Sequence, residues 1–100
     1  MSLVSLASIG ENEPDVGNAV ALMRAAVFKE SALSIKNKAL IALALACALK
    51  CNTCIEANWQ IAVDSGATKE EVRETLVVAM YMAGPTSVVW TPAIDNILAK

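Results

Sequence analysis

An unbroken apolar run from Ala39 to Leu49 constrains the fold of this chain more than any other feature. The run has eleven residues and is bounded by Lys38 and Lys50. A helix needs about 20 apolar residues to span a bilayer, so the run is too short for a membrane anchor. A helix that is apolar on most of its faces is buried on most of its faces. The run therefore predicts a buried helix, and no contact with a membrane is expected.

Further helices are predicted on both sides of this run. Pro14 opens a pattern of apolar residues at helical spacing, and Ser34 is an N-cap candidate for the helix that holds the apolar run. The first two predicted helices run from Pro14 to about Val27 and from Ile35 to about Leu49. The third runs from about Cys54 to Asp64, with an N-cap at Asn52 or Thr53 and a left-handed Gly66 after its end. The fourth begins at the Thr68–Glu71 capping box and ends at Gly84, and a last helix reaches about Leu98 and should be kinked or split by Pro92.

The fold class follows from these helices and from the absence of a β pattern. No alternating apolar and polar run is long enough for a strand. A chain of 100 residues is expected to form one domain. We predict an all-α fold of five helices, with residues 1–13 as an N-terminal arm and residues 14–100 as a single helical domain.

The apolar content is high for a small soluble domain. Apolar residues make up 56% of the chain before its four glycines are counted, whereas roughly 45–50% is typical with glycine included. The simplest explanation is that the chain buries surface against copies of itself, as a homo-oligomer. A membrane-surface helix would need Lys and Arg gathered opposite its apolar face, and a nucleic-acid site would need a basic cluster. Eight dispersed basic residues and a net charge of −2 supply neither.

The cysteines carry the chemistry that this composition leaves open. The chain has no histidine, which excludes Ser-His-Asp and Cys-His triads and zinc sites with imidazole ligands. It has three cysteines, and two of them form the sequence Cys51-Asn52-Thr53-Cys54. We expect no secretory signal before them, because the first eight residues are uncharged and acidic residues follow. We therefore expect a reducing cytoplasm, where a CxxC pair is more often catalytic or metal-binding than structural.

A CxxC pair at the start of a helix can close and reopen a disulfide within one turn. The positive end of the helix dipole and the neighbouring Lys50 both favour a thiolate there. A structural role for small buried cysteines is about equally common, and the polar neighbours favour an accessible site. Cys47 lies in the apolar run and is interpreted as core packing. A metal site at all three cysteines would lack a fourth ligand, so no metal is predicted.

The flanking sequence resembles a known family. Lys36 to Ala44, Cys51 to Asn58, the helix boundary from Ala62 to Val72, and Met82 to Pro85 are similar to the carboxymuconolactone decarboxylase family, in its alkylhydroperoxidase D-like (AhpD-like) branch. The resemblance covers roughly residues 16–98. It implies an all-helical fold, assembly as trimers or hexamers, and peroxidase-type or disulfide reductase activity without a bound cofactor.

The resemblance also assigns roles to the two thiols. It implies that Cys54 reacts with a peroxide to form a sulfenic acid. Cys51 is then the resolving thiol and proton donor, and exchanges with a disulfide of a redox partner protein. Two positions depart from the family pattern: Asn58 replaces the usual His, and Ala39 replaces the usual Glu. The usual proton relay is therefore missing, and we expect weak peroxidase activity, since loss of a general base costs about 10²–10⁴-fold.

No other residue is expected to replace this relay. Glu56 points away from Cys54 on the helix, and Tyr81 and Lys38 could approach only through tertiary contacts. Asn58 and Lys50 remain as weak auxiliary residues. The remaining large side chains are interpreted as structural, with Met23, Met80 and Met82 as core fillers and Trp59 and Trp90 as packing or interface anchors.

Three functions remain open from the sequence. The first is a thiol-based antioxidant protein of the peroxiredoxin or disulfide reductase type. The second is a non-catalytic helical oligomer that kept the fold and lost the chemistry. The third is a lyase of the decarboxylase type that names the family, which the lack of any histidine disfavours.

Overall fold

The structure is a computed structural model that describes residues 3–84 and 92–99. The described residues form helices and no strand, which confirms the all-α prediction. The helices are α1 (Leu3–Asn12), α2 (Pro14–Val27), α3 (Ile35–Ala48), α4 (Asn52–Asp64), α5 (Lys69–Ala83) and α7 (Pro92–Ala99). The described part thus has one helix more than the five predicted, because the segment expected to be an N-terminal arm forms α1.

Capping residues set most of the helix boundaries as predicted. The Ser34 hydroxyl accepts a hydrogen bond from the backbone N–H of Asn37 at the start of α3. At the start of α5, Thr68 and Glu71 form the reciprocal capping box. Gly66 has a φ of 98° just after α4, a left-handed conformation that glycine adopts without steric cost.

Helix α7 begins at Pro92, and the fixed φ of proline fits the first turn of a helix. Whether Pro92 kinks or splits a longer helix depends on residues 85–91, so that prediction is not tested. The remainder of the predicted last helix, including Trp90, lies outside the described residues.

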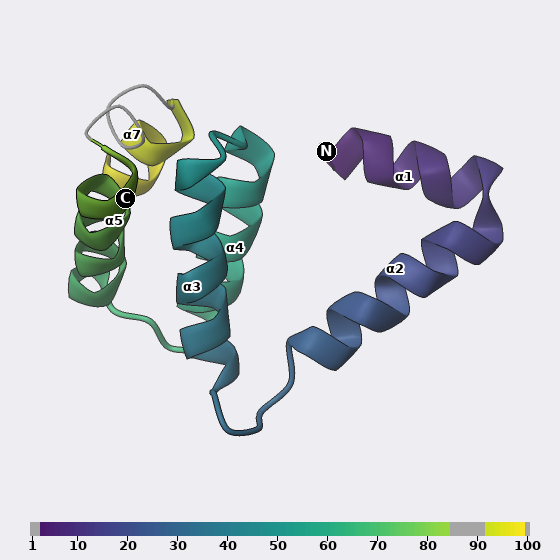
Figure 1. Ribbon diagram of the computed structural model, residues 1–100, viewed down its shortest axis with the longest axis horizontal. Helices are drawn as coiled ribbons and strands as arrows, with labels where there is room; N and C mark the ends of the chain where they lie inside the picture. Colours follow the sequence, from purple (N-terminus) through teal and green to yellow (C-terminus); the bar gives the residue numbers. More distant parts are fainter. Residues whose placement is uncertain (1–2, 85–91, 100) are drawn as a thin grey trace.

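A four-helix bundle of α3, α4, α5 and α7 contains the core (Figure 1). The apolar run supplies the inner face of α3, where Leu43 and Cys47 are fully buried. The prediction that this helix is buried on most of its faces is wrong, because Ile41, Leu45 and Leu49 are 49%, 59% and 78% exposed. They pack in one cluster with Ile55 of α4 and Ile94 of α7. An ion pair between Lys36 Nζ and Glu71 Oε2, 2.9 Å long, joins the starts of α3 and α5.

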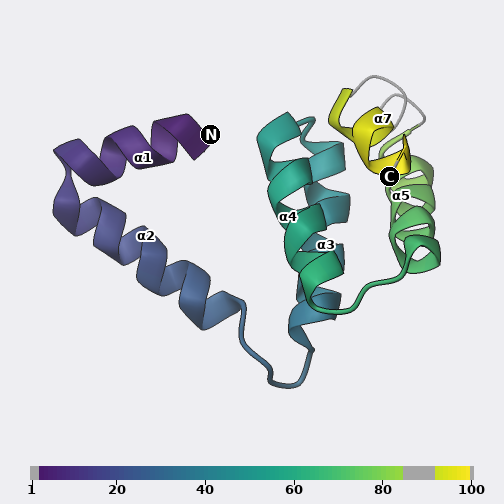
Figure 2. The ribbon, with the colours of Figure 1, turned by 180° about the vertical axis from the view of Figure 1, so that it is seen from behind.

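Helices α1 and α2 form a hairpin that extends away from this bundle (Figures 1 and 2). We call residues 3–27 the N-terminal hairpin. Its two helices meet closely at Gly17 and Gly10, since a Cβ built on Gly17 would lie 2.6 Å from Gly10 Cα. Helix α2 has no buried residue. Its exposed large apolar side chains are Val16, Val20, Leu22, Met23 and Val27.

The three methionines interpreted as core fillers are not in the core. Met23, Met80 and Met82 are 70%, 38% and 75% exposed. They lie on faces of α2 and α5 that the described residues leave exposed, although their helical spacing is that of a buried stripe. None of the helices described here is long and apolar enough to cross a bilayer.

Candidate redox site

Cys51 and Cys54 form a disulfide at the amino end of α4. Their Cα atoms are 5.2 Å apart, as expected for residues one turn apart. Cys51 is the N-cap residue of the helix, and Cys54 is the third residue after it. The bond is therefore held within a single helical turn.

The turn between α3 and α4 places Cys51 at this position. Lys50 has a φ of 56°, the one left-handed residue other than glycine in the described part of the chain. Its N–H donates to the Cys47 carbonyl and the Cys51 N–H donates to the Ala46 carbonyl, each at 3.1 Å. This pair of bonds is the Schellman arrangement that ends many helices, usually with glycine in the left-handed position. The chain thus leaves α3 and enters α4 directly at the first thiol.

The N-cap was predicted at Asn52 or Thr53, and this prediction is wrong by one or two residues. Cys51 has the extended backbone of an N-cap, and its Sγ accepts the backbone N–H of Cys54 at 3.3 Å. Asn52 is already the first helical residue. The Thr53 hydroxyl lies 3.7 Å from Cys51 Sγ. The sulfur of Cys51 therefore occupies the place that a Ser or Asp oxygen usually takes at a helix start.

The three cysteines lie in different environments. Cys51 and Cys54 are half-buried, and Cys54 packs against the core cluster. Cys47 is a free thiol with no exposed surface, which confirms it as core packing. Burial raises the pKa of Cys47 to about 11, because the charged thiolate is disfavoured away from water. The described residues contain no cluster of three or more His, Cys, Asp or Glu side chains able to hold a metal.

The two departures from the family pattern are visible in the structure. Asn58 lies one turn after Cys54, and its side-chain Nδ2 donates to the Cys54 carbonyl at 2.8 Å. Its amide is thereby tied to the backbone of the disulfide turn. Ala39 is fully buried and brings no polar group. Glu56 is exposed to solvent, as predicted from its position on the helix.

The other auxiliary candidates do not reach the sulfurs. Lys38 Nζ donates to the Lys29 carbonyl and to Ser31 Oγ, at 2.8 and 3.0 Å, near the opposite end of α3. Tyr81 is 83% exposed. Lys50 is exposed and adjacent to Cys51. The structure thus brings Lys50, Thr53 and Asn58 to the disulfide turn and leaves Lys38 and Tyr81 elsewhere.

The cap role of Cys51 was missed, although the sequence carries a signal for it. The spacing of Cys51 and Cys54 equals that of Thr68 and Glu71, which form the capping box of α5. A CxxC pair that begins a helix has the spacing of an N-cap and its third helical residue. Asn and Thr are usual cap residues and sulfur is a weak acceptor, so cap preference alone favours Asn52 and Thr53.

Comparisons with known proteins agree with this fold. Residues 14–93 match the carboxymuconolactone decarboxylase family. The chain is 34% identical over 79 residues to "uncharacterized protein 4 in cox locus" of Paracoccus denitrificans, across 76% of this chain and 71% of that protein. It is similar to the structure of a carboxymuconolactone decarboxylase family protein from Legionella pneumophila, with 34% identity, a TM-score of 0.84, and 96% of this chain and 86% of that chain covered. A structure from Burkholderia xenovorans LB400 shares the fold at 20% identity, with a TM-score of 0.86 over 95% of this chain and 75% of that chain.

Proposed function

Because this chain belongs to the carboxymuconolactone decarboxylase family, we propose that it is a thiol-based antioxidant protein that works through the Cys51–Cys54 pair. The observation that supports this proposal most directly is the disulfide within the first turn of α4. A pair at this position can cycle between dithiol and disulfide without moving a helix. The proposed substrates are a peroxide, or a disulfide on a redox partner protein, in a reducing cytoplasm. No cofactor takes part in the proposed cycle.

The proposed cycle has three steps. The Cys54 thiolate attacks the terminal oxygen of a hydroperoxide, the O–O bond breaks, and the alkoxide leaves and takes a proton to become an alcohol. The Cys51 thiol then attacks the Cys54 sulfenic acid, so that an S–S bond forms and water leaves. Finally a dithiol of the partner protein reduces the disulfide by exchange and is itself oxidised.

The hydrogen bond to Cys51 supports its role in exchange. In the disulfide, the Cys54 N–H donates to Cys51 Sγ. The same N–H, at the positive end of α4, would stabilise a thiolate on Cys51 after reduction. Cys51 is then suited to attack a partner's disulfide, while Cys54, packed against the core, is suited to a small peroxide.

The missing relay sets the expected rate. Asn58 does not titrate near neutral pH, and its Nδ2 is bonded to the Cys54 carbonyl. We expect the Asn58→His variant to consume peroxide at least tenfold faster than the unsubstituted chain, since general acid–base catalysis contributes about 10²–10⁴-fold. Asn58→Gln is the matched control and should show no gain.

A peroxide titration of the reduced protein tests the proposal. One equivalent of cumene hydroperoxide should convert the dithiol to the Cys51–Cys54 disulfide, measured by peptide mass spectrometry. Cys51→Ser should trap a sulfenic acid on Cys54 that reacts with dimedone, and Cys54→Ser should consume no peroxide. Cys47→Ala is the control and should behave as the unsubstituted chain.

Two results would refute the proposal together. One is peroxide consumption no faster than that of free glutathione, and the other is no exchange with a dithiol such as thioredoxin. Cys54→Ser would then match the unsubstituted chain in both assays. That outcome would favour the non-catalytic helical oligomer, which the backbone-bonded Asn58 and the apolar Ala39 also fit.

We also propose that the protein assembles as a homo-oligomer, either a trimer or a hexamer, as the family resemblance implies. The support is the N-terminal hairpin, whose helix α2 has no buried residue. Leu22 and Met23 are 71% and 70% exposed, and apolar side chains at this density usually mark an interface. Light scattering after gel filtration should show three or six subunits. Leu22→Glu with Met23→Glu should lower that number, whereas a monomeric unsubstituted chain would refute the assembly.

A further inference from the structure

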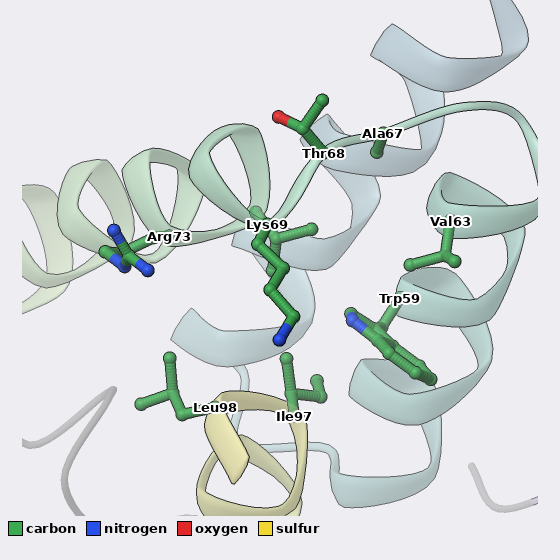
Figure 3. A pocket seen from close by; sticks show the side chains of 9 residues that line it. Trp59, Val63, Ala67, Thr68, Lys69, Arg73, Ile97 and Leu98 are labelled. Atoms are coloured by element: carbon green, nitrogen blue, oxygen red, sulfur yellow. The ribbon is translucent and has the colours of Figure 1, made fainter. Parts of the chain in front are cut away.

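A pocket outside the disulfide turn lies between α4, α5 and α7 (Figure 3). Its volume is about 300 Å³. Its walls are mostly apolar and come from all three helices: Trp59 and Val63 from α4, Val72 from α5, and Ile97 and Leu98 from α7. The redox cycle proposed above uses none of these residues.

Two positively charged side chains line this apolar pocket. Lys69 and Arg73 both line it, one turn apart at the start of α5. Figure 3 shows the Lys69 ammonium directed from α5 toward Ile97, beside the Trp59 ring. Neither cation has a carboxylate partner among the described residues, and no Asp or Glu lines the pocket.

Helix α5 carries three carboxylates; Glu70 and Glu74 do not line the pocket, and Glu71 is engaged elsewhere. Glu71 pairs with Lys36 of α3 and accepts the Thr68 N–H in the capping box. The lysine neutralises it on the side of α5 that faces α3. The pocket therefore combines apolar walls with two positive charges and no negative charge of its own.

We propose that this pocket binds a small amphipathic carboxylate of the medium-chain fatty-acid class. The apolar tail lies against Trp59, Val63 and Ile97, and the carboxylate lies between Lys69 and Arg73. The volume is at the small end of ligand pockets. At about 30 Å³ for each water-sized group, it holds roughly ten such groups, which matches an acid of about eight to ten carbons.

A second copy of this chain is the competing occupant. An α-helix with its side chains is about 10–12 Å across, so a pocket of 300 Å³ admits single side chains of another subunit and not a helix. The proposal therefore commits to a small molecule, and a role of the pocket in assembly is one outcome of the test. The test does not depend on the thiols, so failure of the redox cycle would leave it intact.

Trp59 provides the signal for this test. In the Trp90→Phe variant of this chain, Trp59 is the only tryptophan. Titration with sodium decanoate below its micellar concentration should change its fluorescence saturably, and calorimetry on the unsubstituted chain should give the same Kd. Octanoate has two methylenes fewer and should bind about fifteenfold more weakly, because each buried methylene contributes roughly a fourfold change in affinity. Decyltrimethylammonium, with an equal tail and the opposite charge, should not bind.

Variants separate the charge of the pocket from its shape. Lys69→Gln and Arg73→Gln should each weaken decanoate binding about three- to fivefold, since both cations are exposed to solvent. Arg24→Gln, which removes a cation from α2, should leave the Kd unchanged. Val63→Phe should fill the pocket and abolish binding while the far-ultraviolet circular dichroism stays native.

Several results would overturn the proposal. One is equal binding of decanoate and decyltrimethylammonium, and another is an unchanged Kd in the Lys69 and Arg73 variants. A third is the absence of any saturable response in both the fluorescence and the calorimetry. If Lys69→Gln or Val63→Phe changes the subunit number without any ligand present, the pocket belongs to a subunit interface, and the proposal is equally overturned.

Discussion

Lys50 has a backbone conformation that residues other than glycine usually avoid, and replacing it with glycine should stabilise the protein. Its φ is 56°, in the Schellman turn that delivers Cys51 to the start of α4. This conformation costs an L-residue about 1–2 kcal/mol. Glycine avoids that cost but gains freedom in the unfolded chain, which offsets about 0.4–1 kcal/mol. Lys50→Gly should therefore raise the free energy of unfolding by roughly 1 kcal/mol.

Urea denaturation of the disulfide form measures this change. For a small protein the free energy falls by about 1 kcal/mol per molar urea at the low end of the usual range, so the midpoint should rise by up to about 1 M. Lys50→Gln removes the same charge without relieving the backbone and should leave the midpoint within experimental error. Lys50→Asn should fall between the two, because asparagine tolerates the left-handed region.

The charge of Lys50 is tested in the same set of variants. Lys50→Gly and Lys50→Gln both remove the cation next to Cys51 and should slow its exchange with a small disulfide to the same extent. Lys50→Gly should therefore change both the stability and the exchange rate, whereas Lys50→Gln should change only the exchange rate. If Lys50→Gly were no more stable than Lys50→Gln, the strain at this turn would not exist and the reasoning would fail.

Three further predictions follow from other parts of the structure. Burial raises the pKa of Cys47 to about 11, so this thiol ionises at lower pH in the unfolded chain than in the folded protein. The free energy of unfolding, measured by chemical denaturation, should therefore fall by roughly 2 kcal/mol between pH 9 and pH 11 relative to the Cys47→Ala variant. Gly17→Ala should separate α1 from α2, because its Cβ would lie 2.6 Å from Gly10 Cα, and amide exchange in the N-terminal hairpin should accelerate. Gly10→Ala, which meets nothing within 4 Å, should slow that exchange. The Lys36 hydrogen bond, followed by the bond from the Thr68 N–H, lowers the pKa of Glu71. The contribution of ionised Glu71 to stability is thus complete above the ordinary pKa of this carboxyl and is lost as pH falls below it. In the Glu71→Gln variant the thermal melting temperature should therefore fall less between pH 5 and pH 3.

Local signals in the sequence predicted much of this fold. Ser34, Thr68 and Gly66 fix helix ends through contacts within a few residues, and such contacts are visible in the order of the residues. The buried face of α3 follows from the apolar run, and Cys47 lies on it as expected. The exposed Met82 marks the limit of this reasoning. A stripe of apolar residues predicts burial, but not whether the burying surface belongs to the same chain.

The site was predicted in part for the same reason. Cys51 and Cys54 are three residues apart, so one helical turn brings them together. The N-cap is Cys51 and not Asn52 or Thr53, because ordinary cap preference favours side-chain oxygens and does not point to a sulfur acceptor. The pocket of Trp59, Arg73 and Ile97 was not predicted at all, because its walls come from three helices whose packing leaves no trace in local spacing.

The position of the N-terminal hairpin bears on how this protein responds to dilution. Helix α2 buries no side chain in its own chain, and short helices without tertiary packing are marginal in water. In the proposed assembly the N-terminal hairpin, about a quarter of the chain, would become ordered as subunits associate. Its order would therefore rise with the amount of protein in the cell. The bundle that holds the disulfide has its own core and would keep its fold when subunits part. The concentration of the protein would then determine whether the N-terminal hairpin is ordered, and the thiol pair would not change.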